Sequence, residues 1–272
     1  MPDARRTEAG SRALPEMKPD TKPGTKPVEL LRTEALSVHY GGVTANDSVE
    51  LSVHAGEVVG LIGPNGAGKT TFVDAVTGFT PCTGEVFLCG VPLRGGPHRR
   101  RRAGLGRTWQ AGELFDDVTV ADNVAVAART VGLRTLFSDI TGRSARSRPE
   151  ESEALALLGL LEDAHRRPSE LSLGRQKLVG VARALVGGTR VVLLDEPAAG
   201  LDTVESRQLG HDVRRVAESG RGVLLIDHDM ALVMDFCDRI HVMDFGVVIA
   251  SGTPQEVRED PRVVAAYLGG AA

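Results

Sequence analysis

Residues 63–70 have the sequence G-P-N-G-A-G-K-T, whose residue types and spacing suit the binding of a phosphate chain. Glycines let successive backbone N–H groups turn toward an anion with no Cβ in the way. Lys69 supplies a positive charge for the β- and γ-phosphates, and the Thr70 hydroxyl is placed to ligate Mg²⁺. An apolar run precedes the loop and a helical pattern follows it, so the context predicts a nucleoside triphosphate site. The expected contacts are Gly63, Pro64, Asn65, Gly66, Ala67, Gly68, Lys69, Thr70 and Thr71.

Two adjacent carboxylates, Asp195 and Glu196, follow a second apolar run at residues 191–194. Because side chains alternate along a strand, the two acids cannot share one role. Asp195 suits a metal ligand or the outer shell of a metal, whereas Glu196 can face an attacking water. Hydrolysis of a γ-phosphate needs positioning, charge neutralisation and a base that orients water. We therefore expect an enzyme that hydrolyses a nucleoside triphosphate, with Glu196 as the base.

The elements that must position these residues alternate between buried strands and helices. Apolar runs at 58–62, 190–194 and 222–226 are typical of strands covered on both faces. Helical patterns lie between and after them, at 70–76, 120–129, 150–161, 174–185 and 204–219. This alternation predicts an α/β core with a parallel sheet. Strand-like stretches at 30–40, 49–53 and 85–89 suggest an attached antiparallel layer.

Composition narrows the class of protein. The chain has 272 residues, 42% of them hydrophobic and 25% charged, with a net charge of −4. A negative charge with one short basic run, Arg99 to Arg102, disfavours a nucleic-acid partner. That run is interpreted as a solvated edge, with contact to acidic lipid headgroups as the alternative. The three cysteines form no CxxC pair, and no apolar run approaches the ~20 residues of a membrane span. Residues 1–27 have a Lys-Pro repeat and are expected to be a disordered tail.

Taken in order, the motifs resemble those of the ABC-type ATPases, the nucleotide-binding subunits of ABC transporters. The resemblance covers roughly residues 28–269 and includes residues 171–176, L-S-L-G-R-Q, which match the family signature. It implies a P-loop NTPase core with a mainly parallel sheet, an antiparallel β layer and a helical subdomain at about residues 112–186. It also implies ATP hydrolysis with Mg²⁺ in a head-to-tail dimer that holds two ATP molecules.

In that family, the signature of one subunit caps the γ-phosphate held by the opposite subunit. The resemblance therefore assigns Ser172, Gly174 and Arg175 to the nucleotide. The segment begins a helix, where a hydroxyl and N–H groups can bind an anion. The chain departs from the usual signature at Leu173, in place of glycine, and at Arg175, in place of glutamine. Because Ser172 and Gly174 are intact, we expect ATPase activity to be retained.

Four further residues match family positions. Gln110 matches the glutamine that touches Mg²⁺ and senses the membrane partner, and Asp202 matches the loop that crosses the dimer interface. His228 matches the switch histidine, a donor to the γ-phosphate, and Tyr40 stands where an aromatic ring stacks on adenine. Taken alone, Tyr40 would fit a strand-end anchor and His228 a structural histidine. The resemblance implies Glu196, His228 and Lys69 as catalytic residues and Thr70, Gln110 and Asp195 as metal ligands.

A narrower resemblance, to the ATP-binding subunits of branched-chain amino acid importers, rests on R-T-W-Q at 107–110, D-H-D-M at 227–230 and A-Y-L-G at 266–269. It implies a homodimer or a heterodimer with a second ATPase, transmembrane permease subunits and an extracytoplasmic solute-binding protein. It places the chain on the cytoplasmic face of the membrane. The alternatives are an importer of another small solute and a soluble ABC-type ATPase that is not coupled to transport.

Overall fold

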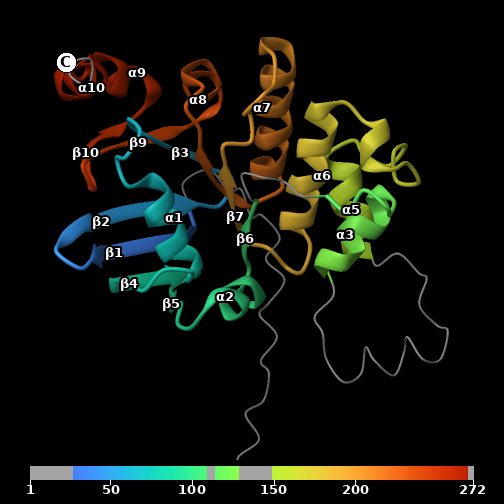
Figure 1. The fold of residues 1–272 in the computed structure, drawn as a ribbon, viewed down its shortest axis with the longest axis horizontal. Helices are drawn as coiled ribbons and strands as arrows, with labels where there is room; N and C mark the ends of the chain where they lie inside the picture. The colour runs from blue at the N-terminus through green and yellow to red at the C-terminus, as the bar shows by residue number, and fades with distance from the viewer. Residues whose placement is uncertain (1–26, 109–113, 129–148, 269–272) are drawn as a thin grey trace, which may run out of the picture.

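The computed structural model describes residues 27–108, 114–128 and 149–268, which form two sheets surrounded by helices (Figure 1). The central sheet has six strands in the order β10-β9-β3-β8-β7-β6. All of its neighbouring pairs are parallel except β10–β9. Its strands are β3 (Val58–Ile62), β6 (Leu105–Arg107), β7 (Val191–Asp195), β8 (Gly222–Ile226), β9 (Arg239–Asp244) and β10 (Val247–Gly252).

The parallel strands form where the sequence has short, wholly apolar runs. Every residue of β3, β7 and β8 is buried, as expected for strands that helices or a second sheet cover on both faces. The register pairs Leu61 with Ile226, and Ile226 with Asp195. The segments that begin at Gly63, Glu196 and Asp227 therefore leave the sheet side by side at its carboxyl edge.

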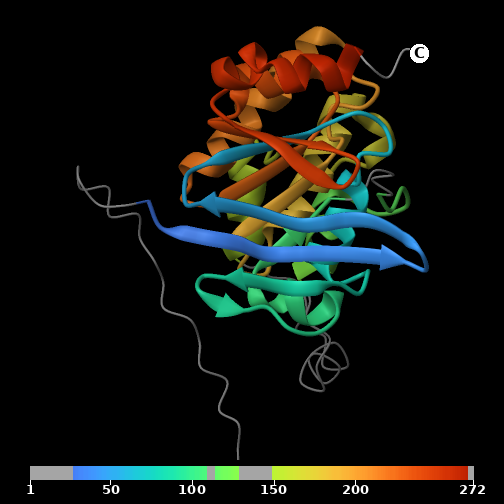
Figure 2. The same cartoon turned by 90° about the vertical axis from the view of Figure 1, so that its left-hand side faces the viewer.

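The second sheet is antiparallel, in the order β2-β1-β4-β5, and crosses one side of the molecule as a layer (Figure 2). A core cluster that includes Leu31, Val53, Phe72 and Leu224 packs this layer and helix α1 against the central sheet. The strands and helix of this layer are β1 (Glu29–Tyr40), β2 (Val43–His54), β4 (Thr83–Leu88), β5 (Val91–Pro92) and α1 (Lys69–Thr77).

Helices on the opposite face of the central sheet build a second core cluster. Three of them, α3, α5 and α6, lie within the expected helical subdomain (Figure 1). The helices described are α2 (Pro97–Ala103), α3 (Val120–Ala128), α5 (Pro149–Leu157), α6 (Leu173–Leu185), α7 (Thr203–Glu218), α8 (Met230–Phe236), α9 (Pro254–Glu259) and α10 (Pro261–Leu268). None of the helices in the described ranges is long and apolar enough to cross a bilayer.

The α/β fold with a mainly parallel sheet, an antiparallel layer and a helical region is confirmed. The domain boundaries remain predictions. The predicted tail lies outside the described residues except for Pro27.

The arginine run on α2 departs from expectation. Arg100 Nη1 donates to the carbonyls of Ala75 (2.8 Å) and Val76 (2.7 Å) at the end of α1. Arg101 donates to the carbonyls of Arg183 (3.1 Å) and Val186 (2.6 Å) at the end of α6. A solvated edge is therefore wrong for these two side chains, because cations are stabilised by the last carbonyls of a helix.

Candidate nucleotide-binding site

The phosphate loop, residues 63–71, connects β3 to α1 in a shape that only glycine allows at two points. Gly63 has φ +151° and Gly68 has φ +97°. A Cβ on Gly63 would lie 2.1 Å from the Met243 carbonyl oxygen, and one on Gly68 would lie 2.6 Å from the Ala45 carbonyl oxygen. Gly68 is also the N-cap of α1, with no side chain bonded to the first turn. The N-terminus of α1 is thus directed at the loop, where an anion would be stabilised.

Lys69 folds back over this loop. Its Nζ donates to the carbonyl oxygens of Gly63 (2.7 Å) and Pro64 (3.0 Å). Burial lowers the pKa of Lys69, while the nearby charges of Glu196 and Asp195 raise it. The structure thus brings together the lysine and the two acids that the sequence predicted to act together.

Asp195 ends β7 and is buried at the carboxyl edge of the sheet. Arg107 bridges two acids there: its Nη2 donates to Asp195 Oδ2 at 2.9 Å, and its Nη1 to Asp74 Oδ1 on α1 at 2.5 Å. Burial raises the pKa of Asp195, and the hydrogen bond and charge of Arg107 oppose this. The N–H of Asp195 donates to Thr108 Oγ1 at 3.1 Å. Arg107, for which the sequence predicted no role of its own, therefore connects α1, β6 and β7.

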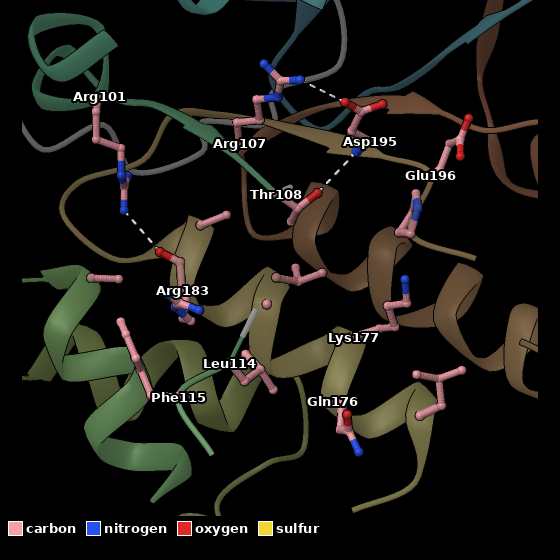
Figure 3. Close-up of a pocket in the computed structure, with 16 residues that line it drawn as sticks. Arg101, Arg107, Thr108, Leu114, Phe115, Gln176, Lys177, Arg183, Asp195 and Glu196 are labelled. Carbon is pink, nitrogen blue, oxygen red and sulfur yellow. Dashed lines mark hydrogen bonds and ion pairs between the residues drawn. The ribbon is translucent and has the colours of Figure 1, made fainter. Parts of the chain in front are cut away.

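Glu196 leaves the strand through a left-handed backbone conformation, with φ +48°. Its N–H donates to the Ile226 carbonyl at 2.7 Å, which keeps this turn at the sheet edge. Positive φ is uncommon for residues other than glycine and costs about 1–3 kcal/mol in backbone strain. Figure 3 shows the side chains of Asp195 and Glu196 at one end of a cavity of about 640 Å³, which continues to Phe115 and Arg183 in the helical region.

The switch position lies on the neighbouring turn. The His228 side chain is 68% exposed, and its Nδ1 lies 3.7 Å from Oδ1 of the buried Asp227. Asp227 accepts hydrogen bonds from the N–H groups of His228 (2.8 Å), Asp229 (2.9 Å) and Ala198 (3.0 Å). The role of Asp227 could not be predicted from the sequence, because its bond to Ala198 depends on the pairing of β7 with β8.

Tyr40 lies at the end of β1 and remains half exposed, with its hydroxyl 3.4 Å from Thr80 Oγ1. It pairs with Val43 on β2, and three residues later Asn46 Nδ2 donates to the Gly68 carbonyl at 3.2 Å. The hairpin that carries Tyr40 therefore contacts the phosphate loop. Its predicted stacking on adenine stays a prediction.

The signature segment begins α6, on the opposite face of the central sheet from α1 (Figure 1). Ser172 is the N-cap of α6 and accepts a hydrogen bond from the N–H of Arg175 at 3.4 Å. The Arg175 side chain is bonded to Asp163 and to the Gly159 carbonyl (2.8 Å). Leu173 and Gln176 of the signature line the same cavity as Asp195 and Glu196.

Asp202 and Gln110 complete the predicted set. Asp202 caps α7, with Oδ1 accepting from the N–H groups of Val204 and Glu205, both at 2.8 Å. Gln110 lies outside the described residues.

The C-terminal helix also reaches the site. The Tyr267 side chain contacts the backbone of Gly63, and this contact lowers the pKa of the phenol. Burial has the larger, opposite effect and raises the pKa.

Comparison with known proteins identifies this arrangement. The family model "ABC transporter" matches residues 46–199. The chain belongs to the ABC transporter family of ATP-binding proteins. A second family model, "Branched-chain amino acid ATP-binding cassette transporter", matches residues 247–272. The chain is therefore an ABC ATPase that binds nucleotide.

Relatives of this ABC ATPase match over most of their length. LivG of Escherichia coli K12, a high-affinity branched-chain amino acid transport ATP-binding protein, is 39% identical over 88% of this chain and 98% of its own. BraF of Pseudomonas aeruginosa, named in the same way, is 38% identical over the same shares. The solved ADP conformation of MJ1267, an ATP-binding cassette of an ABC transporter, superposes with a TM-score of 0.76 at 30% identity, covering 89% of this chain and 99% of that one.

Proposed function

We propose that this ABC ATPase energises the uptake of branched-chain or closely related amino acids. The observation that carries the proposal is the match of residues 247–272, beyond the part matched by the general ABC transporter model, to a model of branched-chain amino acid transporters. The names of LivG and BraF support the same substrate class.

Each ATP would bind along the phosphate loop, with Tyr40 against the adenine. The N-terminus of α1 and the charge of Lys69 would neutralise the β- and γ-phosphates. The hydroxyl of Thr70 and the carboxylate of Asp195 are hard oxygen donors, which Mg²⁺ takes together with substrate phosphates, so both fit this ion. Gln110 is the third proposed ligand. When bound, Mg²⁺ would help to neutralise charge on the phosphates.

Glu196 would orient and deprotonate the attacking water, because its left-handed turn takes the chain out of the line of β7, which ends at Asp195. His228 is exposed on the adjacent turn and would donate a hydrogen bond to the γ-phosphate. The negative charge that develops on the transferred phosphoryl group would thus be stabilised by Lys69 and His228, which lie on two segments at the same edge of the sheet.

The chain would act as a head-to-tail dimer, with an identical copy or a second ABC ATPase. The signature lies on the opposite face of the sheet from α1, so Ser172 and Gly174 would reach the γ-phosphate held by the partner. Asp202 begins α7 next to this region and would lie at the interface. Arg175 would support the signature through Asp163 or contact the nucleotide after exchanging that partner.

Transport requires further subunits. We propose permease subunits in the membrane, which hold this chain at the cytoplasmic face, and an extracytoplasmic solute-binding protein.

The test is reconstitution in proteoliposomes of this chain with any permeases, second ATPase and solute-binding protein that neighbouring genes encode. ATP inside the vesicles should drive uptake of radiolabelled leucine, isoleucine or valine, and Glu196→Gln should lower both turnover and uptake about 10²-fold or more. ATP hydrolysis without uptake of any of the three would refute the proposed substrate class. Uptake that survives Glu196→Gln would refute the role of the base.

A further inference from the structure

Asp227 is a fully buried carboxylate at the junction of two catalytic segments. It follows β8, directly before His228, and its side chain has no exposed surface. Oδ1 accepts from the N–H groups of His228 (2.8 Å) and Asp229 (2.9 Å). Oδ2 accepts from the N–H of Ala198 (3.0 Å), two residues after Glu196. One side chain thus bonds the backbone of both turns.

The same two turns are linked again further from the sheet. Asp229 caps α8 through Oδ1, which accepts from the N–H of Ala231 (3.0 Å), and its Oδ2 accepts from Ser206 Oγ on α7 (2.7 Å). The N–H of Ser206 in turn donates to the carbonyl of Asp202 (2.8 Å). These hydrogen bonds connect the segment that follows Asp227 to both ends of the segment from Glu196 to Asp202.

We propose that Asp227 is a positioning residue that makes the segment of the catalytic base and the switch segment move as one unit. The inference rests on the proposed roles of Glu196 and His228 and adds a residue that reaches the reaction only through them. A buried carboxylate is suited to this task because it offers acceptors on both oxygens and forms strong, charge-assisted bonds with backbone N–H groups.

An amide of the same shape cannot replace it fully. In Asp227→Asn, the remaining oxygen can still accept from His228 and Asp229. The NH₂ group then faces the N–H of Ala198, donor against donor, and the segment of Glu196 loses its attachment. Because a small misplacement of a catalytic group can cost about 10²-fold in rate, we expect kcat for ATP hydrolysis to fall about 10- to 100-fold. The KM for ATP should stay within about threefold, since the phosphate loop is untouched.

A double-mutant cycle with Glu196→Gln separates positioning from general damage to the fold. Because Asp227→Asn detaches the segment of Glu196, it should change the residual kcat of Glu196→Gln by less than about threefold. The proposal would be overturned if Asp227→Asn lowered kcat by the same factor in the wild type and in the variant that already lacks the catalytic residue. A raised KM with an unchanged kcat would also overturn it.

The matched control is Asp238→Asn, at the amino edge of the same sheet. Asp238 Oδ2 accepts from the N–H of Val58 at 2.8 Å and pairs with Arg214. We expect a lower melting temperature and an unchanged kcat for this variant. An inactive wild type would contradict the proposed function, whereas an active wild type that is indifferent to Asp227→Asn would contradict only the role of Asp227.

A second measurement uses the wild type, in case Asp227→Asn does not fold. Amide hydrogen exchange resolved by NMR should show Ala198, His228 and Asp229 protected to a similar degree, because one opening event frees all three N–H groups. An Ala198 amide that exchanges at least tenfold faster than the other two would overturn the coupling of the segments.

Discussion

His241 makes the stability of the fold sensitive to acid. It lies on β9, is 95% buried, and neither ring nitrogen has a hydrogen-bond partner among the described residues. Burial, with the charge of Arg239 as a smaller contribution, lowers the pKa of His241 to about 4, and Glu57 opposes the shift. The ring is therefore held neutral in the folded chain at pH values where the unfolded chain takes up a proton.

The magnitude follows from the difference between the two pKa values. The ordinary value is 6.5, so the folded state loses up to about 3 kcal/mol relative to the unfolded state, at about 1.4 kcal/mol per pKa unit. The penalty is absent at pH 7.5, where the ring is neutral in both states. It grows as the pH falls through 6.5 and levels off near 4. At pH 4.5 it amounts to about 2.5 kcal/mol.

The assay compares the wild type with His241→Leu, which keeps a similar volume and removes the titrating group. We expect the free energy of unfolding in urea to fall about 2.5 kcal/mol further for the wild type than for the variant between pH 7.5 and pH 4.5. At pH 7.5 the variant should be at least as stable, because two buried polar atoms are removed. His39→Gln, at an exposed histidine, is the control variant. A constant difference between wild type and His241→Leu across this range would refute the reasoning.

Three further predictions concern other contacts. Tyr267→Phe removes the hydroxyl that contacts the backbone of Gly63, and it should raise the Kd for ATP about threefold to tenfold in a calorimetric titration. An unchanged Kd would show that the contact is not used. Gly180→Ala, within α6, should raise the free energy of unfolding by about 1 kcal/mol through helix propensity, and a loss of stability would count against it. Arg101→Leu should cost about 2 kcal/mol, because carbonyls at the end of α6 lose their donor, whereas Arg99→Leu on the exposed side of α2 should stay within about 0.5 kcal/mol.

The sequence predicted those strands and helices whose pattern of apolar residues lies within the element itself. The wholly apolar runs became β3, β7 and β8, and the helical patterns at 70–76 and 204–219 correspond to α1 and α7 within one residue at each end. Both signals arise from burial along a single element, so they can be recognised without knowing its neighbours. The phosphate loop was equally clear, since Gly63 and Gly68 occupy backbone conformations that other residues avoid.

The remaining features depend on contacts between distant segments. The strand β9 was not predicted because Arg239 and His241 interrupt its apolar pattern, although His241 is buried. Arg100 and Arg101 resembled a solvated charge run, because the helix ends they cap are far away in sequence. Asp227 could not be distinguished from an ordinary acid beside a histidine, since its contact with Ala198 follows from strand register.

The hydrogen bonds of Arg101 also fix one end of α6, about which this helix can tilt. They fasten the C-terminal end of α6 to α2, while the N-terminal end carries Ser172. A helix of 13 residues is about 20 Å long. Each 10° of tilt about this end would move Ser172 by about 3.5 Å, which is enough to make or break the phosphate contact proposed for it.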